Sequence, residues 1–324
     1  MELYNKINNF QLDDSYLFFD IFCRNNELIV ITPIINHNNL NHMTITHNNS
    51  ILDRIQVLKT DWIVVQFYHV NINMDKIISI IVEFNNNQKQ YDLQHLMICK
   101  QYGLIQSTLF KDDNYLLPKF TSHYNGLGVE HYYLYYNDKL EKLNFTASNV
   151  TLIEWDYQYY FMNQKGFGHA QAGQLNHSLY KYAKVLGEYI LYNDLDEYIQ
   201  VNLNKLIQNT TIDTFMFRNI WADTIIEPTD MNDYYKMIGS ELTIPKEYCV
   251  NLYANDNGHH SKCIHKTSSI YLIQNIHCGE YYNTSKNVFS DNLYMLHFFR
   301  WVPPHIDHHV RERKDVRFIY FATK

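Results

Sequence analysis

The sequence has few of the residues that interrupt or cross-link a chain. Its 324 residues include ten Gly, six Pro and five Cys. With 46% hydrophobic residues, this composition excludes a chain that is disordered over most of its length. The odd number of cysteines and the absence of a Cys-x-x-Cys pair indicate neither a disulfide framework nor a thiolate zinc site. A reducing compartment is therefore expected.

Basic residues and long apolar runs are also scarce. The chain has 27 Lys and Arg against 34 Asp and Glu, a formal charge of −7, so a nucleic acid or an anionic membrane is not expected as a partner. No run approaches the roughly 20 apolar residues that a transmembrane helix needs, and the N-terminus MELYNKINNF does not resemble a signal peptide. We expect a soluble, cytoplasmic protein, in the host cytoplasm if the source is a virus. The oligomeric state is left open.

The hydrophobic pattern divides the chain near residue 93. Residues 1–93 read as short β-rich runs separated by Asn-rich turns, which predicts a small sandwich-like accessory domain with a structural or glycan-binding role. Residues 94–324 alternate strands with helical stretches, which predicts an α/β domain with a mainly parallel sheet and flanking helices. Helices are expected around residues 115–124 and 169–184.

Ligands of such sheets bind beyond the carboxyl ends of the strands, so the polar residues there are candidates. These residues are Lys100 after LMICK, Asn137 and Asp138 after EHYYLYY, Trp155 and Asp156 after NVTLIE, and Asp194 to Glu197 after GEYILYN.

The strongest local signal is an apolar strand that ends in the acids Asp194, Asp196 and Glu197. Clustered carboxylates repel one another and are tolerated where a divalent cation neutralises them, and oxygen ligands suit Mg²⁺ or Mn²⁺. Such an ion would bridge the diphosphate of a nucleotide and stabilise the leaving group. A solvated acidic turn is the alternative interpretation.

Four segments, taken in their order along the chain, form a further pattern. They are HYNGLGVEHYYLYYND (123–138), QAGQLNHSLYKYAKVLGEYILYNDLDEYI (171–199), SKCIHKTSSI (261–270) and LHFFR (296–300). Together they resemble glycosyltransferase family 92, in which a Gln-bearing helix leads into a strand ending Asp-x-Asp-Glu-Phe, followed by a Lys-x-Ile block and a late His-Tyr-Arg. The resemblance spans residues 96 to about 301.

The resemblance implies a GT-A nucleotide-diphospho-sugar fold and a manganese-dependent, inverting transfer of a sugar, most often galactose, to a glycan acceptor. The donor is expected to be UDP-linked. Asp194 and Asp196 match the pair that binds the metal and the donor diphosphate. The other matches are Glu197 to the following acid, Gln171 to the helix glutamine, Lys262 to the Lys-x-Ile lysine, and His297 and Arg300 to the late histidine and arginine. The chain departs from the family in two places: Cys99-Lys100-Gln101-Tyr102 stands where the family has an acid after its first strand, and Ser178 stands where the helix usually has cysteine.

The remaining candidates follow from residue chemistry. His297 follows an apolar strand and would complete the metal coordination, with His277 as its competitor. Lys262 and Arg300 would hold phosphate oxygens, and Lys100 and Asp138 are expected at the donor as well. An inverting transfer needs a carboxylate base. Asp223 is the first choice, followed by Glu280, Glu227 and Asp291, with Trp221 as a sugar platform. The HIDHH cluster at 305–309 could form a second metal site, but we favour no metal there.

Two other function classes stay open. A two-metal phosphohydrolase could use the same acids, although the scattered basic residues give no track for a polyanion. A non-enzymatic glycan-binding or structural protein is the third class. Metal-dependent stabilisation by a nucleoside diphosphate would distinguish the transferase from both.

Overall fold

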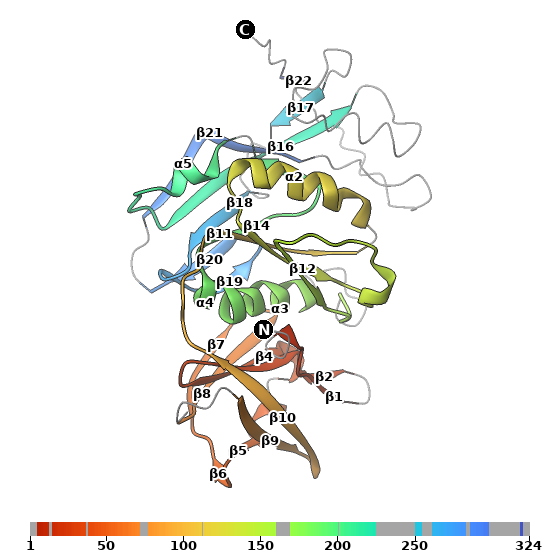
Figure 1. Ribbon diagram of the computed structural model, residues 1–324, viewed down its shortest axis with the longest axis vertical. Helices are drawn as coiled ribbons and strands as arrows, with labels where there is room; N and C mark the ends of the chain where they lie inside the picture. Colours follow the sequence, from red (N-terminus) through yellow and green to blue (C-terminus); the bar gives the residue numbers. More distant parts are fainter. Residues whose placement is uncertain are drawn as a thin grey trace.

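The computed structural model describes residues 5–12, 15–36, 38–71, 77–111, 113–159, 169–199, 201–224, 250–254, 261–282, 286–297 and 318–319. Two large sheets are stacked along the long axis of the molecule, with one long helix between them (Figure 1). Within the described residues, no helix combines the length and apolar character needed to cross a membrane.

The N-terminal sheet has eight strands in the order β6-β5-β9-β10-β3-β4-β8-β7. Its strands are β3 (Asp20–Arg24), β4 (Glu27–Pro33), β5 (Thr44–His47), β6 (Ser50–Ile51), β7 (Arg54–Lys59), β8 (Ile63–His69), β9 (Ile77–Phe84) and β10 (Asn87–Leu96). Beside them lie the short pair β1 (Phe10–Gln11) and β2 (Tyr16–Phe18) and the 3₁₀ turns η1 (Ile34–Asn36) and η2 (Asn39–His42).

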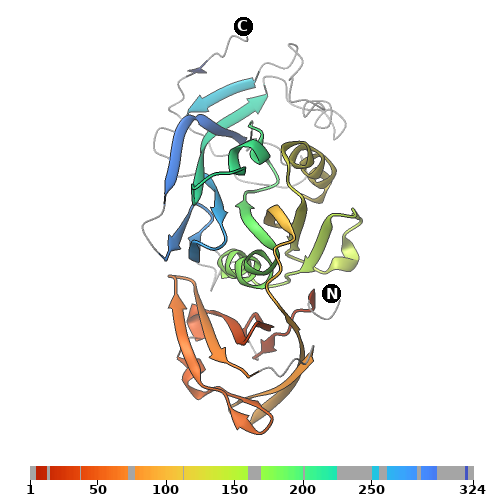
Figure 2. The same cartoon turned by 60° about the vertical axis from the view of Figure 1, so that its left-hand side comes forward.

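Asparagine pairs make the tight turns of this sheet. Asn48 and Asn49 have φ angles of 49° and 60°, and Asn85 and Asn86 have φ angles of 48° and 64°. Asn tolerates this left-handed conformation, which two-residue hairpin turns require. The predicted β-rich part is present. Strands β7, β8, β4 and β3 and strands β6, β5, β9 and β10 are joined where β10 pairs with β3 over two residue pairs, and buried side chains from both groups share one core (Figure 2).

The second sheet has the order β13-β12-β11-β14-β18-β16-β17-β22, and β21 pairs with β16 and β15. Its strands are β11 (Tyr102–Phe110), β12 (His131–Tyr136), β13 (Val150–Glu154), β14 (Gly187–Tyr192), β15 (Glu197–Ile199), β16 (Thr214–Thr224), β17 (Val250–Ala254), β18 (Lys262–Lys266), β21 (Asn287–His297) and β22 (Phe318–Ile319). A separate hairpin joins β19 (Ile270–Asn275) and β20 (Cys278–Tyr281).

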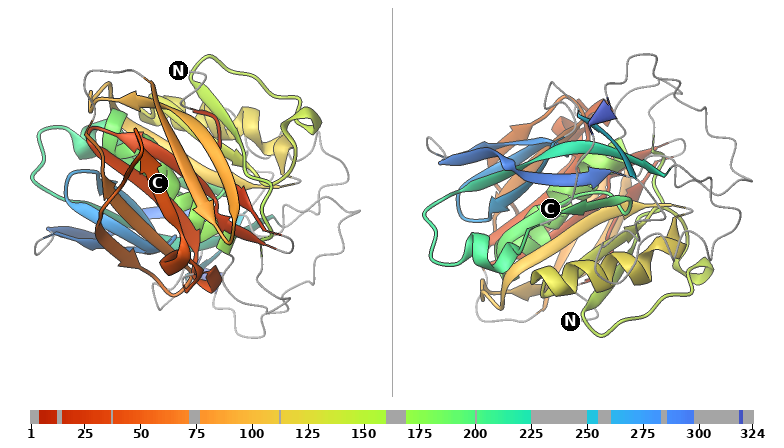
Figure 3. Two further views of the ribbon diagram at one scale, coloured as in Figure 1. Left: turned by 90° about the horizontal axis from the view of Figure 1, so that it is seen from below. Right: turned by 90° about the horizontal axis from the view of Figure 1, so that it is seen from above.

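The α/β prediction holds, but the expectation of a mainly parallel sheet applies to only part of it. Strands β11 to β14 pair in parallel, whereas β18, β16 and β17 pair antiparallel. Parallel neighbours need a long crossover, and α2 and α3 supply helical ones before β12 and β14. After β14, the described residues contain only the five-residue helix α5 (Leu203–Ile207). The pair β16 and β21 is again parallel (Figure 3, right).

The predicted first strand of the α/β region, LMICK, is wrong. Leu96 ends β10 of the N-terminal sheet, and the first strand of the second sheet is β11 (Tyr102–Phe110). Lys100 therefore precedes this strand and does not follow it.

Both predicted helices are confirmed. The first is α2 (Leu117–Leu127), which has Pro118 in its first turn and ends at Gly128, whose φ of 103° suits glycine. The second consists of α3 (His169–His177), a π-helical segment (Ser178–Ala183) and α4 (Lys184–Leu186). Short 3₁₀ turns lie at η3 (Asn114–Leu116) and η4 (Leu140–Lys142).

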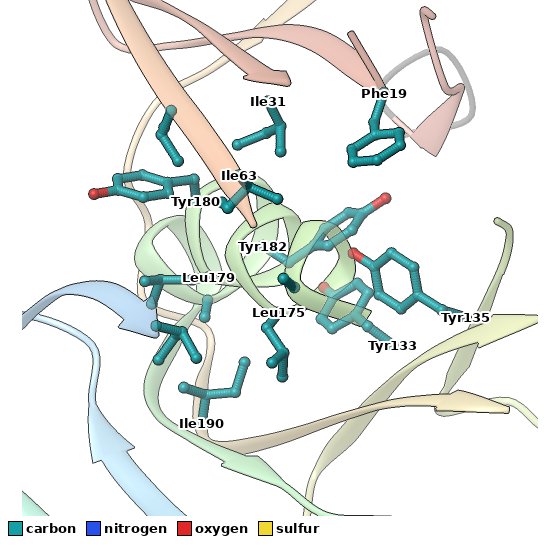
Figure 4. Packing of buried hydrophobic residues seen from close by; sticks show 14 of the residues in the cluster. Phe19, Ile31, Ile63, Tyr133, Tyr135, Leu175, Leu179, Tyr180, Tyr182 and Ile190 are labelled. Atoms are coloured by element: carbon teal, nitrogen blue, oxygen red, sulfur yellow. The ribbon is translucent and has the colours of Figure 1, made fainter. Parts of the chain in front are cut away.

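The long helix is buried between the two sheets. The N-terminal strands cover it on one side (Figure 3, left), and the second sheet covers it on the other. Figure 4 shows Phe19, Ile31 and Ile63 of the N-terminal part on one side of the helix, and Tyr133, Tyr135 and Ile190 of the second sheet on the other. The two parts therefore share one hydrophobic core.

A network of buried polar and charged side chains also links the two parts within this core. Asp20 Oδ2 lies 2.7 Å from Lys181 Nζ and 2.7 Å from His177 Nε2, and all three side chains are fully buried. The hydroxyl of Tyr135 lies 2.6 Å from His177 Nδ1, so the second sheet joins the same network. Asp20 thus fixes the N-terminal sheet to the long helix.

Candidate active site

The acids after β14 lie on a short loop that buried hydrogen bonds hold in place. The hydroxyl of Tyr124, on α2, donates to the carbonyl of Glu197 at 2.7 Å and accepts from the amide of Ile199 at 3.2 Å. The side-chain amide of Asn193 donates to the Tyr124 hydroxyl at 2.9 Å and to the Glu197 carbonyl at 3.0 Å. Gln106 of β11 in turn donates to Asn193 Oδ1. Side chains of α2 and β11 therefore hold the loop in place.

Strand pairing brings the partners of these acids together. Tyr192, the last residue of β14, is paired with Cys263, which puts Lys262 beside the loop. Glu197 is paired with His297, the last residue of β21. Residues far apart in sequence thus meet at the carboxyl end of β14, where a ligand site is expected.

These side chains form a compact charged cluster. Lys262 Nζ lies 2.7 Å from Asp194 Oδ2 and 2.9 Å from Glu197 Oε1. His297 lies between Asp196 and Glu197, with Nε2 3.3 Å from Asp196 Oδ2 and Nδ1 3.4 Å from Glu197 Oε1. The amide of Asp194 donates to Glu197 Oε2 at 2.8 Å. Every acid of the motif therefore has a partner from the chain itself.

The close packing of these side chains shifts their pKa values. Burial raises the pKa of Glu197, and the Lys262 ammonium offsets this only in part. Burial alone would also raise the pKa of Asp194, but the Lys262 charge holds it below its ordinary value. Burial would lower the pKa values of Lys262 and His297, but the surrounding carboxylates raise both. The cluster thus favours a protonated lysine next to an ionised Asp194.

A cavity of about 270 Å³ opens beside the cluster. Its lining combines carboxylates, one lysine and apolar side chains: Leu109, Phe110, Lys111, Asp113, Asn137, Tyr159, Asp194, Leu195, Asp196 and His297. Asn137 uses both amide hydrogens internally, donating to the carbonyls of Trp155 at 2.7 Å and Tyr157 at 2.8 Å. This orients its side-chain oxygen as the group left to accept from a ligand.

Several predicted site residues meet here. Asp194, Asp196 and His297 line the cavity, and Lys262 contacts Asp194 behind it. Asn137, expected at a strand end, also lines it. His277, the competitor of His297, is held by the Ser261 carbonyl, 2.6 Å from its Nδ1, and is not among the lining residues.

Other predicted residues lie elsewhere. Lys100 is at the opposite end of the sheet, where its ammonium donates to the carbonyls of Ala183, Lys184 and Gly187 and so caps the end of the long helix. The prediction that Lys100 lies at the donor site is wrong, because Lys100 precedes β11 and so lies at the amino end of the sheet.

Asp138, Gln171 and Glu280 are absent from the cavity lining. Asp138 forms an ion pair with Lys142 at 2.7 Å. Gln171 lies in the first turn of α3. Glu280 accepts hydrogen bonds from Tyr271 at 2.5 Å and from Gln274, which direct its carboxylate to the neighbouring strand β19 and not to the acidic loop.

Several predicted site residues lie wholly or partly outside the residues that the structure describes. The backbone of Asp223 lies on β16, paired with Asn251 and two residues beyond Trp221, whose partner is His297. The side chains of Asp223, Trp221 and Asp291 lie outside the described residues. So do Glu227, Arg300 and residues 305–309 in full.

Sequence reasoning missed several cavity residues. Lys111 and Asp113 follow β11 at its carboxyl end, and Tyr159 follows β13. Because β11, and not LMICK, is the first strand of the second sheet, Asp113 stands where an acid is expected soon after the first strand. The supporting residues Gln106, Tyr124 and Asn193 carried no local signal, because their hydrogen bonds join distant segments.

The cluster fits a divalent cation in one specific way. Among the described residues, no group of three or more His, Cys, Asp and Glu side chains is arranged to hold a metal ion. The cavity instead presents a pair, Asp196 and His297. Mg²⁺ and related ions commonly take one or two protein ligands together with water and substrate phosphates. The pair therefore suits an ion that binds with a diphosphate.

Comparison with known proteins identifies the class. Residues 105–315 match glycosyltransferase family 92, which covers more than half of the chain and includes every residue of the charged cluster. The chain belongs to glycosyltransferase family 92. No curated protein matches it.

Solved structures give only distant likenesses. Domains 6-7 of the surface layer protein SbsC share 14% identity over 31% of this chain and 52% of that chain, with a TM-score of 0.18. The maltogenic amylase from S. marinus shares 12% over 71% and 38%, with a TM-score of 0.19. The amylomaltase from Corynebacterium glutamicum shares 9% over 36% and 20%, with a TM-score of 0.15. The chain spans about half of the first of these structures, and such scores carry no argument about fold.

Proposed function

We propose that this glycosyltransferase moves a hexose, galactose or a similar sugar, from a UDP-linked donor to a glycan or glycoconjugate acceptor, with inversion at the anomeric carbon. The α/β part would then be a GT-A type domain. Family membership supports the reaction class. The position of the cavity, at the carboxyl ends of β11, β12 and β14, supports a nucleotide sugar as its ligand.

The observation that carries the proposal is the Asp196–His297 pair. Asp196 Oδ2 and His297 Nε2 lie 3.3 Å apart, and both residues line the cavity. Carboxylate and imidazole together are donors for a divalent cation, Mn²⁺ or Mg²⁺. When bound there with the donor, such an ion would neutralise charge on the departing diphosphate.

Asp194 has a different task in this proposal. Its carboxylate lies 2.7 Å from the ammonium of Lys262, a residue that is only 2% exposed. We expect Lys262 to support the diphosphate end of the site electrostatically and Asp194 to orient it. Lys111 lines the cavity itself, and we expect its ammonium to meet phosphate oxygens there.

The acceptor hydroxyl needs a base. Asp223 stays the predicted base, because the backbone of β16 carries it past the His297 pairing position at the same end of the sheet. Glu280 is not retained, because its carboxylate is engaged on β19.

A donor screen tests the proposal. The full chain is incubated with UDP-, GDP- and CDP-hexoses and a mixed glycan acceptor, with Mn²⁺, with Mg²⁺ or with a chelator. Release of one nucleoside diphosphate that depends on metal, together with a glycoside of inverted anomeric configuration, is the expected result. Asp138→Asn, which alters a strand-end acid outside the cavity, should behave as the wild type. If Asp196→Asn releases nucleotide as fast as the wild type, the assignment of the site fails.

A further inference from the structure

The side chain of Asn137, the residue after β12, is held in one orientation at the cavity. Its amide group donates to the carbonyls of Trp155 at 2.7 Å and Tyr157 at 2.8 Å. Carbonyl oxygens can only accept, so these two contacts fix which end of the side chain is the amide. Within the residues that the structure describes, nothing donates to the other end, the oxygen. Asn137 is 6% exposed and lines the cavity, so this oxygen is a buried acceptor at a ligand site.

The segment that holds Asn137 is itself backed by other parts of the chain. The hydroxyl of Tyr157 donates at 2.6 Å to the carbonyl of Phe19 in the N-terminal part. The indole of Trp155 donates at 2.8 Å to the carbonyl of Ala170 in the long helix. The two carbonyls that Asn137 contacts are thus fixed from behind. Its oxygen is therefore a preorganised acceptor, and the N-terminal part of the chain contributes to its orientation.

The strand order separates this acceptor from the Asp196–His297 pair. β11 lies between β12 and β14, and neighbouring strands are roughly 4.8 Å apart, so about 10 Å separates the ends of β12 and β14. Leu109 and Phe110 line the cavity on the strand between them. β16, which carries the predicted base Asp223, lies on the opposite side of β14 from β12. The diphosphate of a nucleotide sugar separates the nucleoside from the hexose. With the hexose towards β16, the nucleoside extends towards Asn137.

The cavity therefore offers a base two kinds of contact. Leu109 and Phe110 supply apolar contact, which every base can use and which selects none of them. The oxygen of Asn137 can only accept, so it selects a base that donates. Uracil joined to ribose has one N–H group, at N3, whereas the corresponding ring nitrogen of cytosine carries a lone pair.

We propose that the side-chain oxygen of Asn137 accepts a hydrogen bond from the N3–H group of uracil and so selects a UDP-linked donor over a CDP-linked one. The inference rests on the proposed function, in which the Asp196–His297 pair receives the diphosphate. The side chain cannot turn over to offer its amide to cytosine, because the buried carbonyls of Trp155 and Tyr157 would then lose their donor.

Three nucleotides test the inference on the full chain. Isothermal titration calorimetry in the presence of Mn²⁺ compares UDP, CDP and N3-methyl-UDP, in which a methyl group replaces the N3 hydrogen. N3-methyl-UDP should bind about 10-fold more weakly than UDP or worse, because its binding leaves the Asn137 oxygen buried without a donor. CDP should also bind more weakly than UDP. These comparisons use the wild type and measure binding without turnover.

A matched pair of variants shows whether Asn137 is the residue that contacts this edge of the base. Asn137→Ala should weaken UDP binding by about 10-fold but change N3-methyl-UDP binding little, so the ratio of the two Kd values should fall towards one. Asn149→Ala makes the same substitution before the amino end of β13, where its side chain contacts Asn125 and not the cavity. It should keep the wild-type ratio.

The possible outcomes separate this inference from the proposed function. If the wild type binds N3-methyl-UDP as tightly as UDP, or if the ratio of Kd values persists in Asn137→Ala, the inference is overturned while the nucleotide site stands. If the wild type binds neither UDP nor CDP with Mn²⁺, the proposed function fails and the inference fails with it. The wild-type comparison is decisive even if Asn137→Ala does not fold.

Discussion

The ammonium of Lys262 lies 2.7 Å from a carboxylate oxygen of Asp194, the first acid of the Asp-x-Asp motif. The chain itself thus supplies a counter-charge to this acid, whereas Asp196 faces the cavity beside His297. The two aspartates are therefore not equivalent in the structure. We expect Asp196 to be the stronger metal ligand and Asp194 to act through Lys262.

Removing the Lys262 charge should destabilise the fold. Lys262→Met keeps the length of the side chain but leaves Glu197 buried without its counter-ion. Breaking a buried ion pair from one side costs roughly 3–5 kcal/mol, so the free energy of unfolding should fall by about that amount. Denaturant unfolding measures it. Lys266→Met, at the other end of β18 and outside the cluster, is the control, and equal stability of the two variants would contradict the account.

Asp196→Asn should separate ligand binding from stability. Asp196 is partly exposed at the cavity, so its loss should change the free energy of unfolding by less than about 0.5 kcal/mol. Binding of Mn²⁺ in the presence of UDP should nevertheless be lost. A calorimetric titration of Mn²⁺ and a melting curve give the two quantities. A variant that melts far below the wild type would show that Asp196 is structural instead.

Asp20→Ala tests the connection between the N-terminal sheet and the long helix. The substitution leaves Lys181 fully buried without its carboxylate partner, so we expect a loss of about 3–5 kcal/mol in stability. Asp61→Ala, at an exposed bend of the same sheet, should lie within about 0.5 kcal/mol of the wild type. Chemical denaturation compares them. Similar midpoints for both variants would show that the Asp20 network contributes little.

Stability should fall as the pH drops from about 6.5 towards 4. Burial lowers the pKa of His177 to about 4 and that of His265 to about 3. In this range the unfolded chain binds protons at both positions while the folded chain does not, so protonation favours the unfolded state. Each histidine contributes a slope of about 1.4 kcal/mol per pH unit. His177→Gln should flatten the profile measured by denaturant unfolding, and an unchanged slope would contradict the assignment of this histidine.

The sequence predicts the local features of this fold better than its long-range pairings. The buried helix, the helix α2 and the strand leading to Asp194 follow from hydrophobic periodicity and are confirmed. The prediction for the first strand is wrong because LMICK is a short apolar run that fits either sheet, and the predicted position of Lys100 depends on it. In the antiparallel half, the described residues between strands hold only the five-residue helix α5, so they give no long helical crossover that would reveal the strand order.

The residues of the candidate site also differ in how far the sequence predicts them. The acids Asp194, Asp196 and Glu197 are adjacent in sequence, so their clustering is visible at once. Lys262 and His297 lie far from these acids in the sequence, and only the strand register explains why they meet them. The hydrogen bonds of Tyr124 and Asn193 leave no sequence pattern, because each partner lies on a different element.

The most direct test of the central claim is a calorimetric titration of UDP into the full chain with Mn²⁺ and, separately, with chelator. The account predicts binding that requires the metal, that is lost in Asp196→Asn and that persists in Asp138→Asn. Binding of equal strength with chelator, or in Asp196→Asn, would contradict a metal-assisted nucleotide site at the Asp196–His297 pair. Absence of binding by UDP and by every other nucleoside diphosphate would contradict the nucleotide-sugar donor itself.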